Sequence, residues 1–150
     1  MKTLVIGYGN TLRRDDGVGY QVAATVASWD LPDVLAWPEH QLLPEMAATL
    51  AVVEQAIFVD AQADQTVTCL ELHRLQPQAP SRGWHHLDPT ALLALSQQLY
   101  GRCPPAYGLW LPVASFEFGE QLSLRGQASV EQALVKIQEL LGQVRESSYA

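Results

Sequence analysis

Two adjacent aspartates, Asp15 and Asp16, lie in the glycine-rich segment that follows the first apolar run of the sequence. Residues 7–19 of this segment read Gly-Tyr-Gly-Asn-Thr-Leu-Arg-Arg-Asp-Asp-Gly-Val-Gly. A glycine-rich turn between a strand and a helix commonly binds phosphate, because a helix N-terminus attracts anions. Here the protein's own carboxylates occupy that position and would repel a phosphate group. The segment therefore indicates cation binding or acid–base chemistry.

The same segment is a poor match to the dinucleotide-binding fingerprint. Gly7 and Gly9 provide two glycines of that pattern, but Leu12 stands at the third position, where glycine allows the helix and the strand to pack closely. Nucleotide binding is disfavoured for this reason and because of the two carboxylates. Taken singly, Asp15 and Asp16 are also explained as a helix cap and as a favourable charge at a helix N-terminus.

A third carboxylate, Asp60, ends the apolar run of residues 56–59. A carboxylate at the end of a buried strand is costly to desolvate without a partner or a metal, although it also fits as the cap of the next turn. His85 and His86 come just before a predicted helix start. One of these histidines, together with Asp16 and Asp60, would provide oxygen and nitrogen ligands suited to nickel, zinc or iron, with coordination positions left for a substrate.

Strands that alternate with helices are expected to hold these residues. Continuous apolar runs are typical of parallel strands covered on both faces. The alternation predicts an α/β fold, a three-layer α/β/α sandwich with a mixed, mostly parallel sheet of about five strands, in which ligands gather at the carboxyl ends of the strands. Pro112 is expected to place the last strand at an edge or a bulge. The strands are predicted over residues 3–7, 34–37, 56–60, 68–72 and 109–114, and the helices over residues 17–28, 44–53, 88–100 and 130–144.

Length and composition limit the class of protein. The 150 residues are expected to form one domain, residues 1–150. The net charge of −7 disfavours nucleic acid or an anionic membrane as the main partner, and no apolar run is long enough to cross a bilayer. Cys69 and Cys103 indicate reduced thiols in a cytoplasmic protein. The sequence has neither the nucleophile elbow of serine hydrolases nor the His-Glu-x-x-His helix of zincins.

These motifs together resemble those of the [NiFe]-hydrogenase maturation proteases, endopeptidases that remove a C-terminal extension from the hydrogenase large subunit after nickel insertion. The resemblance covers nearly the whole chain. Its elements are the opening glycine-rich segment, the strand that ends at Asp60, the His-His-Leu-Asp segment at residues 85–88, and Ser-Phe-Glu-Phe-Gly at residues 115–119. Many members carry an Asp-Gly-Gly-Thr-like turn after the second strand. Here Glu-His-Gln-Leu-Leu-Pro-Glu, residues 39–45, resembles the branch that serves bidirectional, NAD(P)-linked hydrogenases.

The resemblance implies a phosphorylase/hydrolase-like fold and a catalytic, metal-contacting set of Asp16, Asp60 and His85. His85 is preferred to His86 because Leu87 and the leucines after it then fall in the family's register. The resemblance also implies that nickel is supplied within the substrate, the large-subunit precursor, and leaves open whether nickel is catalytic or only recognised. Two other functions are considered: a chaperone-like module that recognises the nickel-loaded precursor without cutting it, and a metallopeptidase of broad specificity.

Overall fold

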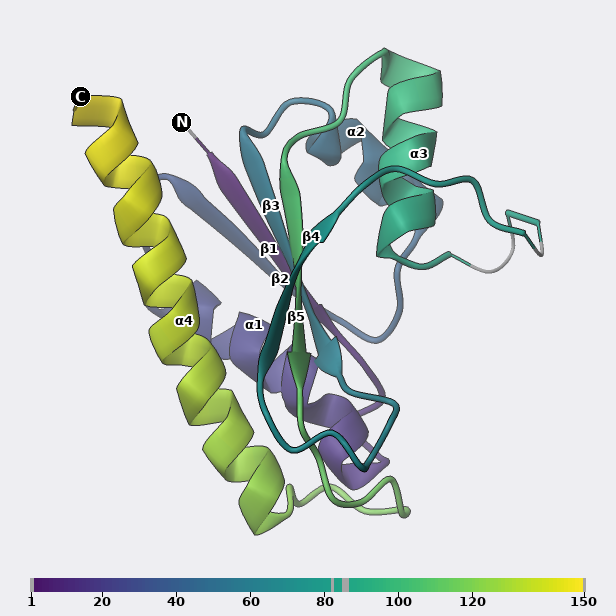
Figure 1. Cartoon of the computed structure of the whole chain (residues 1–150), viewed down its shortest axis with the longest axis vertical. Coiled ribbons are helices and arrows are strands. Elements are labelled where there is room, and N and C mark those ends of the chain that lie inside the picture. Colours follow the sequence, from purple (N-terminus) through teal and green to yellow (C-terminus); the bar gives the residue numbers. More distant parts are fainter. Residues whose placement is uncertain (1, 82, 85–86, 150) are drawn as a thin grey trace.

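The structure is a computed structural model that describes residues 2–81, 83–84 and 87–149, with side chains up to residue 142. Its centre is a five-stranded sheet in the order β2-β1-β3-β5-β4 (Figure 1). The four strands β2, β1, β3 and β5 are parallel, and β4 pairs with β5 in the antiparallel direction at one edge. The prediction of a mixed, mostly parallel sheet is therefore confirmed. The strands are β1 (Thr3–Tyr8), β2 (Val34–Glu39), β3 (Gln55–Ala61), β4 (Glu71–Leu75) and β5 (Ala106–Leu111).

The last two strands differ from their predicted positions. β4 begins later than predicted, and β5 begins earlier, at Ala106. The small side chains of Ala106 and Gly108 weaken the apolar signal at the start of β5. The expectation for Pro112 was wrong, because β5 is an internal strand and Pro112 follows its last residue. A proline at that place ends the pairing without removing a hydrogen bond from the sheet.

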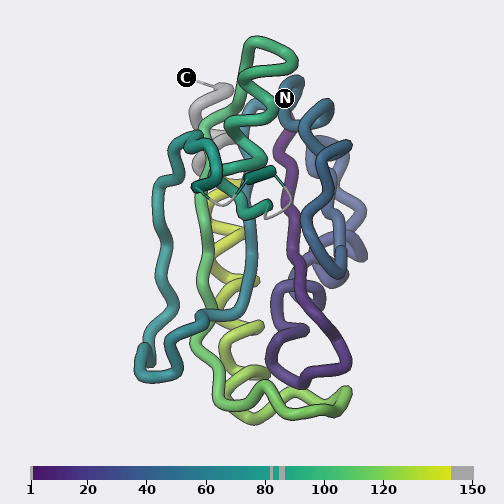
Figure 2. Tube along the Cα trace, turned by 90° about the vertical axis from the view of Figure 1, so that its right-hand side faces the viewer, coloured from purple at the N-terminus to yellow at the C-terminus, as the bar shows by residue number. Residues whose placement is uncertain are grey.

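Helices cover both faces of the sheet, as predicted. α1 (Val18–Ser28) and α4 (Leu124–Tyr149) lie on one face, and α2 (Ala47–Leu50) and α3 (Pro89–Tyr100) lie on the other (Figures 1 and 2). Alternate residues of the central strands supply the two cores. Val5 and Ile57 pack toward α1 and α4, whereas Ile6 and Phe58 pack toward α2 and α3. Two short 3-10 helices, η1 (Arg14–Gly17) and η2 (Pro44–Met46), precede α1 and α2.

The helix ends follow the sequence signals. The Asp88 carboxylate caps α3 by accepting a hydrogen bond from the Ala91 amide at 2.8 Å. Gly101 ends α3 with a φ of 74°, a conformation that favours glycine. α4 has 26 residues and buries one face, which includes Ala133 and Ile137. Of the helices described, none combines the length and the apolar character that crossing a membrane requires.

Glycines allow α1 to approach the sheet closely. A Cβ atom on Gly7 would lie 1.8 Å from the Gly19 carbonyl oxygen, and a Cβ atom on Gly19 would lie 2.3 Å from the Val59 carbonyl oxygen. Neither contact is possible for a larger residue, so the N-terminus of α1 lies directly against β1 and β3. This contact places η1, which carries Asp15 and Asp16, beside the carboxyl end of β3.

Candidate functional site

Asp16 and Asp60 line one pocket, although they lie far apart in the sequence. The pocket has a volume of about 250 Å³. It lies at the carboxyl edge of the sheet, where parallel folds commonly bind ligands. Its described lining is Arg13, Asp16, Asp60, Ala61, Ala63 and Phe116.

Asp16 is half-buried and keeps one carboxylate oxygen available. Its Oδ2 atom accepts a hydrogen bond from the Asn10 amide at 2.8 Å. Within the described part of the chain, the Oδ1 atom has no hydrogen-bond partner. Among the described residues nothing occupies this oxygen, which could bind a cation or a water molecule.

Asp60 has a pKa suited to proton transfer near neutral pH. Burial is the largest cause and raises the pKa of this carboxyl group to about 7. The negative charge of Asp16 also raises the pKa of Asp60. Two hydrogen bonds lower it: one from the Ala61 amide, which donates to Oδ1 at 2.8 Å, and one from the Tyr8 hydroxyl. Burial, followed by the charge of Asp60, raises the pKa of Tyr8, so the Tyr8 hydroxyl keeps its proton and acts as the donor. A carboxyl group with this pKa exchanges protons efficiently at physiological pH.

Asp60 lines two pockets. The second pocket, of about 320 Å³, extends to the N-terminus of α3. Asp60, Ala61 and Ala63 line both pockets, so the two are neighbours at this carboxylate. The other described residues of the second pocket are Tyr8, Gln62, Leu75, Asp88, Pro89, Thr90 and Trp110.

Asp15 has a structural role instead. It is 0% exposed, and its carboxylate accepts hydrogen bonds from the amides of Ala114, Ser115 and Ser123 and from the Ser123 hydroxyl at 2.5–3.1 Å. Burial alone would raise the pKa of Asp15, but the Ser123 hydroxyl and these amides lower it overall. No side-chain cap forms at η1 or α1, so the reading of either aspartate as a helix cap was wrong. Asp15 instead attaches the segment after β5 to the first loop.

Sequence reasoning missed the contacts of the two arginines. Arg13 and Arg14 come directly before Asp15 in the first loop. Their Nε atoms donate to the carbonyl oxygens of Phe116 at 3.2 Å and Gln121 at 3.0 Å, respectively. The partners are 103 and 107 residues away in the sequence, so no local pattern reveals them. The signal in the sequence that could have indicated these contacts is the Ser-Phe-Glu-Phe-Gly motif at residues 115–119, to which the sequence alone assigns no role.

The histidine of the predicted set cannot be placed. His85 and His86 lie outside the described residues. Within the described ranges, no group of three or more His, Cys, Asp and Glu side chains could hold a metal ion. Asp16 and Asp60 supply two carboxylate groups to one pocket, and carboxylate oxygens can act as ligands of a divalent cation.

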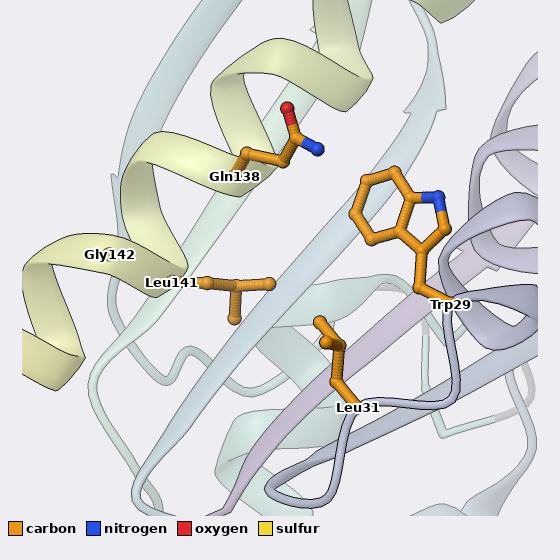
Figure 3. A pocket seen from close by; sticks show the side chains of 5 residues that line it. All are labelled: Trp29, Leu31, Gln138, Leu141 and Gly142. Atoms are coloured by element: carbon orange, nitrogen blue, oxygen red, sulfur yellow. The ribbon is translucent and has the colours of Figure 1, made fainter.

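The described lining of the hollow between α1 and α4 contains no ionisable side chain. It has a volume of about 330 Å³ and lies between the C-terminal end of α1 and the last described side chains of α4 (Figure 3). Trp29 and Leu31 face Leu141 and Gln138 across it. None of its described lining residues titrates, so the candidate site remains the pocket around Asp16 and Asp60.

The fold corresponds to that of a known class of protein. The structure has the α/β fold of the hydrogenase maturation proteases. HycI, a [NiFe] hydrogenase maturation protease from Thermococcus kodakarensis KOD1, superposes with a TM-score of 0.74 at 20% identity, over 94% of this chain and 92% of that one. The hydrogenase maturating endopeptidase HybD from E. coli gives 0.72 at 20% identity, over 98% and 94%.

A third solved structure agrees with these two. The hydrogenase 2 maturation peptidase from Thaumarchaeota archaeon SCGC_AB-539-E09 gives a TM-score of 0.71 at 24% identity, over 95% of this chain and 99% of that one. No protein-family model matches the sequence, and no curated protein matches it. At these identities the comparison establishes the fold, and the predicted fold class is confirmed.

Proposed function

We propose that this protein is an endopeptidase that removes the C-terminal extension of a [NiFe]-hydrogenase large-subunit precursor after nickel insertion. The observation that carries the proposal is the convergence of Asp16 and Asp60 on one pocket, in a fold shared with proteins named as hydrogenase maturation proteases. The sequence of residues 39–45 supports a bidirectional, NAD(P)-linked hydrogenase as the source of the precursor. The free thiols of Cys69 and Cys103 fit a reaction in the cytoplasm.

The precursor would bring the metal to the site. Asp16 and Asp60, with His85 as a proposed third ligand, would contact nickel already bound in the precursor and so position the C-terminal extension. Two carboxylates in one pocket repel each other, and a cation between them relieves that repulsion. Docking would thus depend on nickel. Asp60 would accept a proton from the water that attacks the scissile carbonyl.

The direct test is the mass of a nickel-loaded precursor after incubation with the purified protein. The proposal predicts a single shortened product that lacks the C-terminal extension. A stable complex with an unchanged precursor mass would instead identify the chaperone-like module. Cleavage of unrelated short peptides at a similar rate would identify a metallopeptidase of broad specificity.

A further inference from the structure

Arg13 brings an unpaired positive charge to the pocket of the two carboxylates. It lines this pocket together with Asp16 and Asp60. Its Nε atom is fixed by the Phe116 carbonyl oxygen at 3.2 Å. Over the described ranges, the terminal guanidinium nitrogens have no hydrogen-bond partner, and no carboxylate lies within ion-pair distance of them. The side chain is therefore anchored at one nitrogen and free at its outer end.

Neutralising the two aspartates does not account for this arginine. Asp16 accepts a hydrogen bond from the Asn10 amide, and Asp60 accepts one from the Ala61 amide. Within the described ranges, neither carboxylate accepts a hydrogen bond from Arg13, whose Nε atom donates to the Phe116 carbonyl oxygen instead. The guanidinium thus has donors available for an anion that the protein itself does not supply, and planar N–H donors suit a negatively charged oxygen.

We propose that Arg13 stabilises the oxyanion that forms on the substrate carbonyl during peptide cleavage. This inference rests on the proposed function. The water oxygen bonds to the carbonyl carbon, the carbonyl π electrons move to its oxygen, and the water proton passes to Asp60. The negative oxygen then accepts hydrogen bonds from Arg13. When the C–N bond breaks, the carbonyl re-forms, and the nitrogen of the released extension takes up the proton. Arg13 donates to the oxygen on which negative charge develops in the transition state, and a donor at this place accelerates the chemical step.

Arg14 provides a matched control. Its Nε atom also donates to a carbonyl oxygen of the segment after β5, that of Gln121 at 3.0 Å. It does not belong to the described lining of the pocket. Replacement of either arginine by alanine removes one hydrogen bond to the segment after β5. Only Arg13→Ala also removes a charge from the described lining of the pocket.

The experiment measures kcat and KM for shortening of the nickel-loaded precursor by the wild type, Arg13→Ala and Arg14→Ala. We expect Arg13→Ala to lower kcat by about 100-fold with little change in KM, which is the usual effect of losing one oxyanion donor. Arg14→Ala should keep a kcat close to that of the wild type. Added guanidinium ion should restore part of the activity of Arg13→Ala, whereas urea, which is planar but neutral, should not.

Each alternative outcome has a definite meaning. Equal kcat values for Arg13→Ala and Arg14→Ala, or a change in KM alone, would overturn the role of Arg13 while leaving the proposed function intact, because the wild type still cuts. If Arg13→Ala is poorly folded, Arg13→Lys is measured in its place. A wild-type kcat in Arg13→Lys would mean that a positive charge is sufficient without the planar guanidinium group. A folded Arg13→Ala variant whose activity is not restored by added guanidinium ion would also count against the proposal. A wild type that leaves the precursor uncut would remove both proposals together.

Discussion

Asp15 and Asp16 are neighbours in the sequence but have opposite environments. Asp15 is fully buried among donors from residues 114–123, whereas Asp16 is half-buried and lines the pocket. The polar contacts of Asp15 stabilise the fold, whereas Asp16 lies where a ligand in the pocket could reach it. We therefore expect a structural role for Asp15 and a functional role for Asp16.

Replacing each aspartate with alanine tests this division. Asp15→Ala leaves buried amides without an acceptor, and each such group costs about 1–3 kcal/mol. We expect it to lower the free energy of unfolding by about 3 kcal/mol or more, as measured by urea denaturation. Asp16→Ala should lower it by about 1 kcal/mol or less while abolishing cleavage of the precursor. Equal losses of stability in the two variants would contradict the assignment.

The pKa of Asp60 predicts the pH dependence of activity. If the ionised carboxylate is the base, kcat/KM should fall by about tenfold per unit as the pH drops below the pKa of about 7. The measurement is the rate of precursor shortening in overlapping buffers. A profile that stays flat through this range would argue against Asp60 as the base.

Asp60 also makes a prediction about stability. Because its pKa is raised in the folded protein, its contribution to stability is fully present below the pKa of the unfolded chain and is lost as the pH rises through about 7. Asp60→Asn has no ionisable group at this position, so it does not lose this contribution to stability as the pH rises. The variant should be inactive, and its free energy of unfolding relative to the wild type should increase between acidic and mildly alkaline pH. A constant difference between the two proteins would show that Asp60 titrates normally.

At the scale of elements, the close contact between α1 and the sheet aligns the site. Gly7 and Gly19 leave no room for a Cβ atom, and η1 follows the position of α1. The segment after β5 is bound to the same loop through Asp15, Arg13 and Arg14. The geometry of the pocket therefore depends on the close packing of α1 and on the contacts that bind the segment after β5 to the first loop.

Gly7→Ala tests that dependence. The added methyl would lie 1.8 Å from the Gly19 carbonyl oxygen, so α1 and η1 must move away from β3. We expect a lower melting temperature and a loss of precursor cleavage. Gly142→Ala in α4 is the control, because a Cβ atom there has nothing within 4 Å, and the change should stabilise the helix by about 0.5–1 kcal/mol. A Gly7→Ala variant with normal stability and activity would refute this account of the glycine.

Much of this arrangement could be predicted from the sequence, for physical reasons. The central strands are predictable because burial on both faces requires continuous apolar runs. Asp60 is recognisable as a candidate because it is a carboxylate at the end of such a run. The cap at Asp88 and the stop at Gly101 are local signals. The role of Asp15 and the position of Arg13 depend on partners about 100 residues away, which no local pattern contains. The start of β5 was missed because Ala106 and Gly108 are small.

At the scale of the whole molecule, the strand order determines which loops meet. β1 and β3 are adjacent at the centre of the sheet, so the loop after β1 and the end of β3 share one edge. The segment after β5 lies beside the first loop at the same end of the molecule, and backbone hydrogen bonds join the two (Figures 1 and 2). The result is a pocket at the carboxyl edge of the sheet that two carboxylates and one guanidinium line.

Nickel dependence is the prediction at this scale. If the metal of the precursor relieves the repulsion between Asp16 and Asp60, the nickel-loaded precursor should be shortened and the nickel-free precursor should remain intact. Gel mobility and intact mass report the difference. Equal cleavage of both precursors would indicate that the metal plays no part in docking.

The most direct test of the central claim is the rate of precursor shortening under single-turnover conditions by the wild type, Asp16→Asn and Asp60→Asn, with melting temperatures measured on the same samples. The account predicts that both variants remain folded and that each loses at least about 100-fold in rate, as expected when a positioned acid–base group is removed. Wild-type rates in two folded variants would contradict the assignment of the site to these carboxylates.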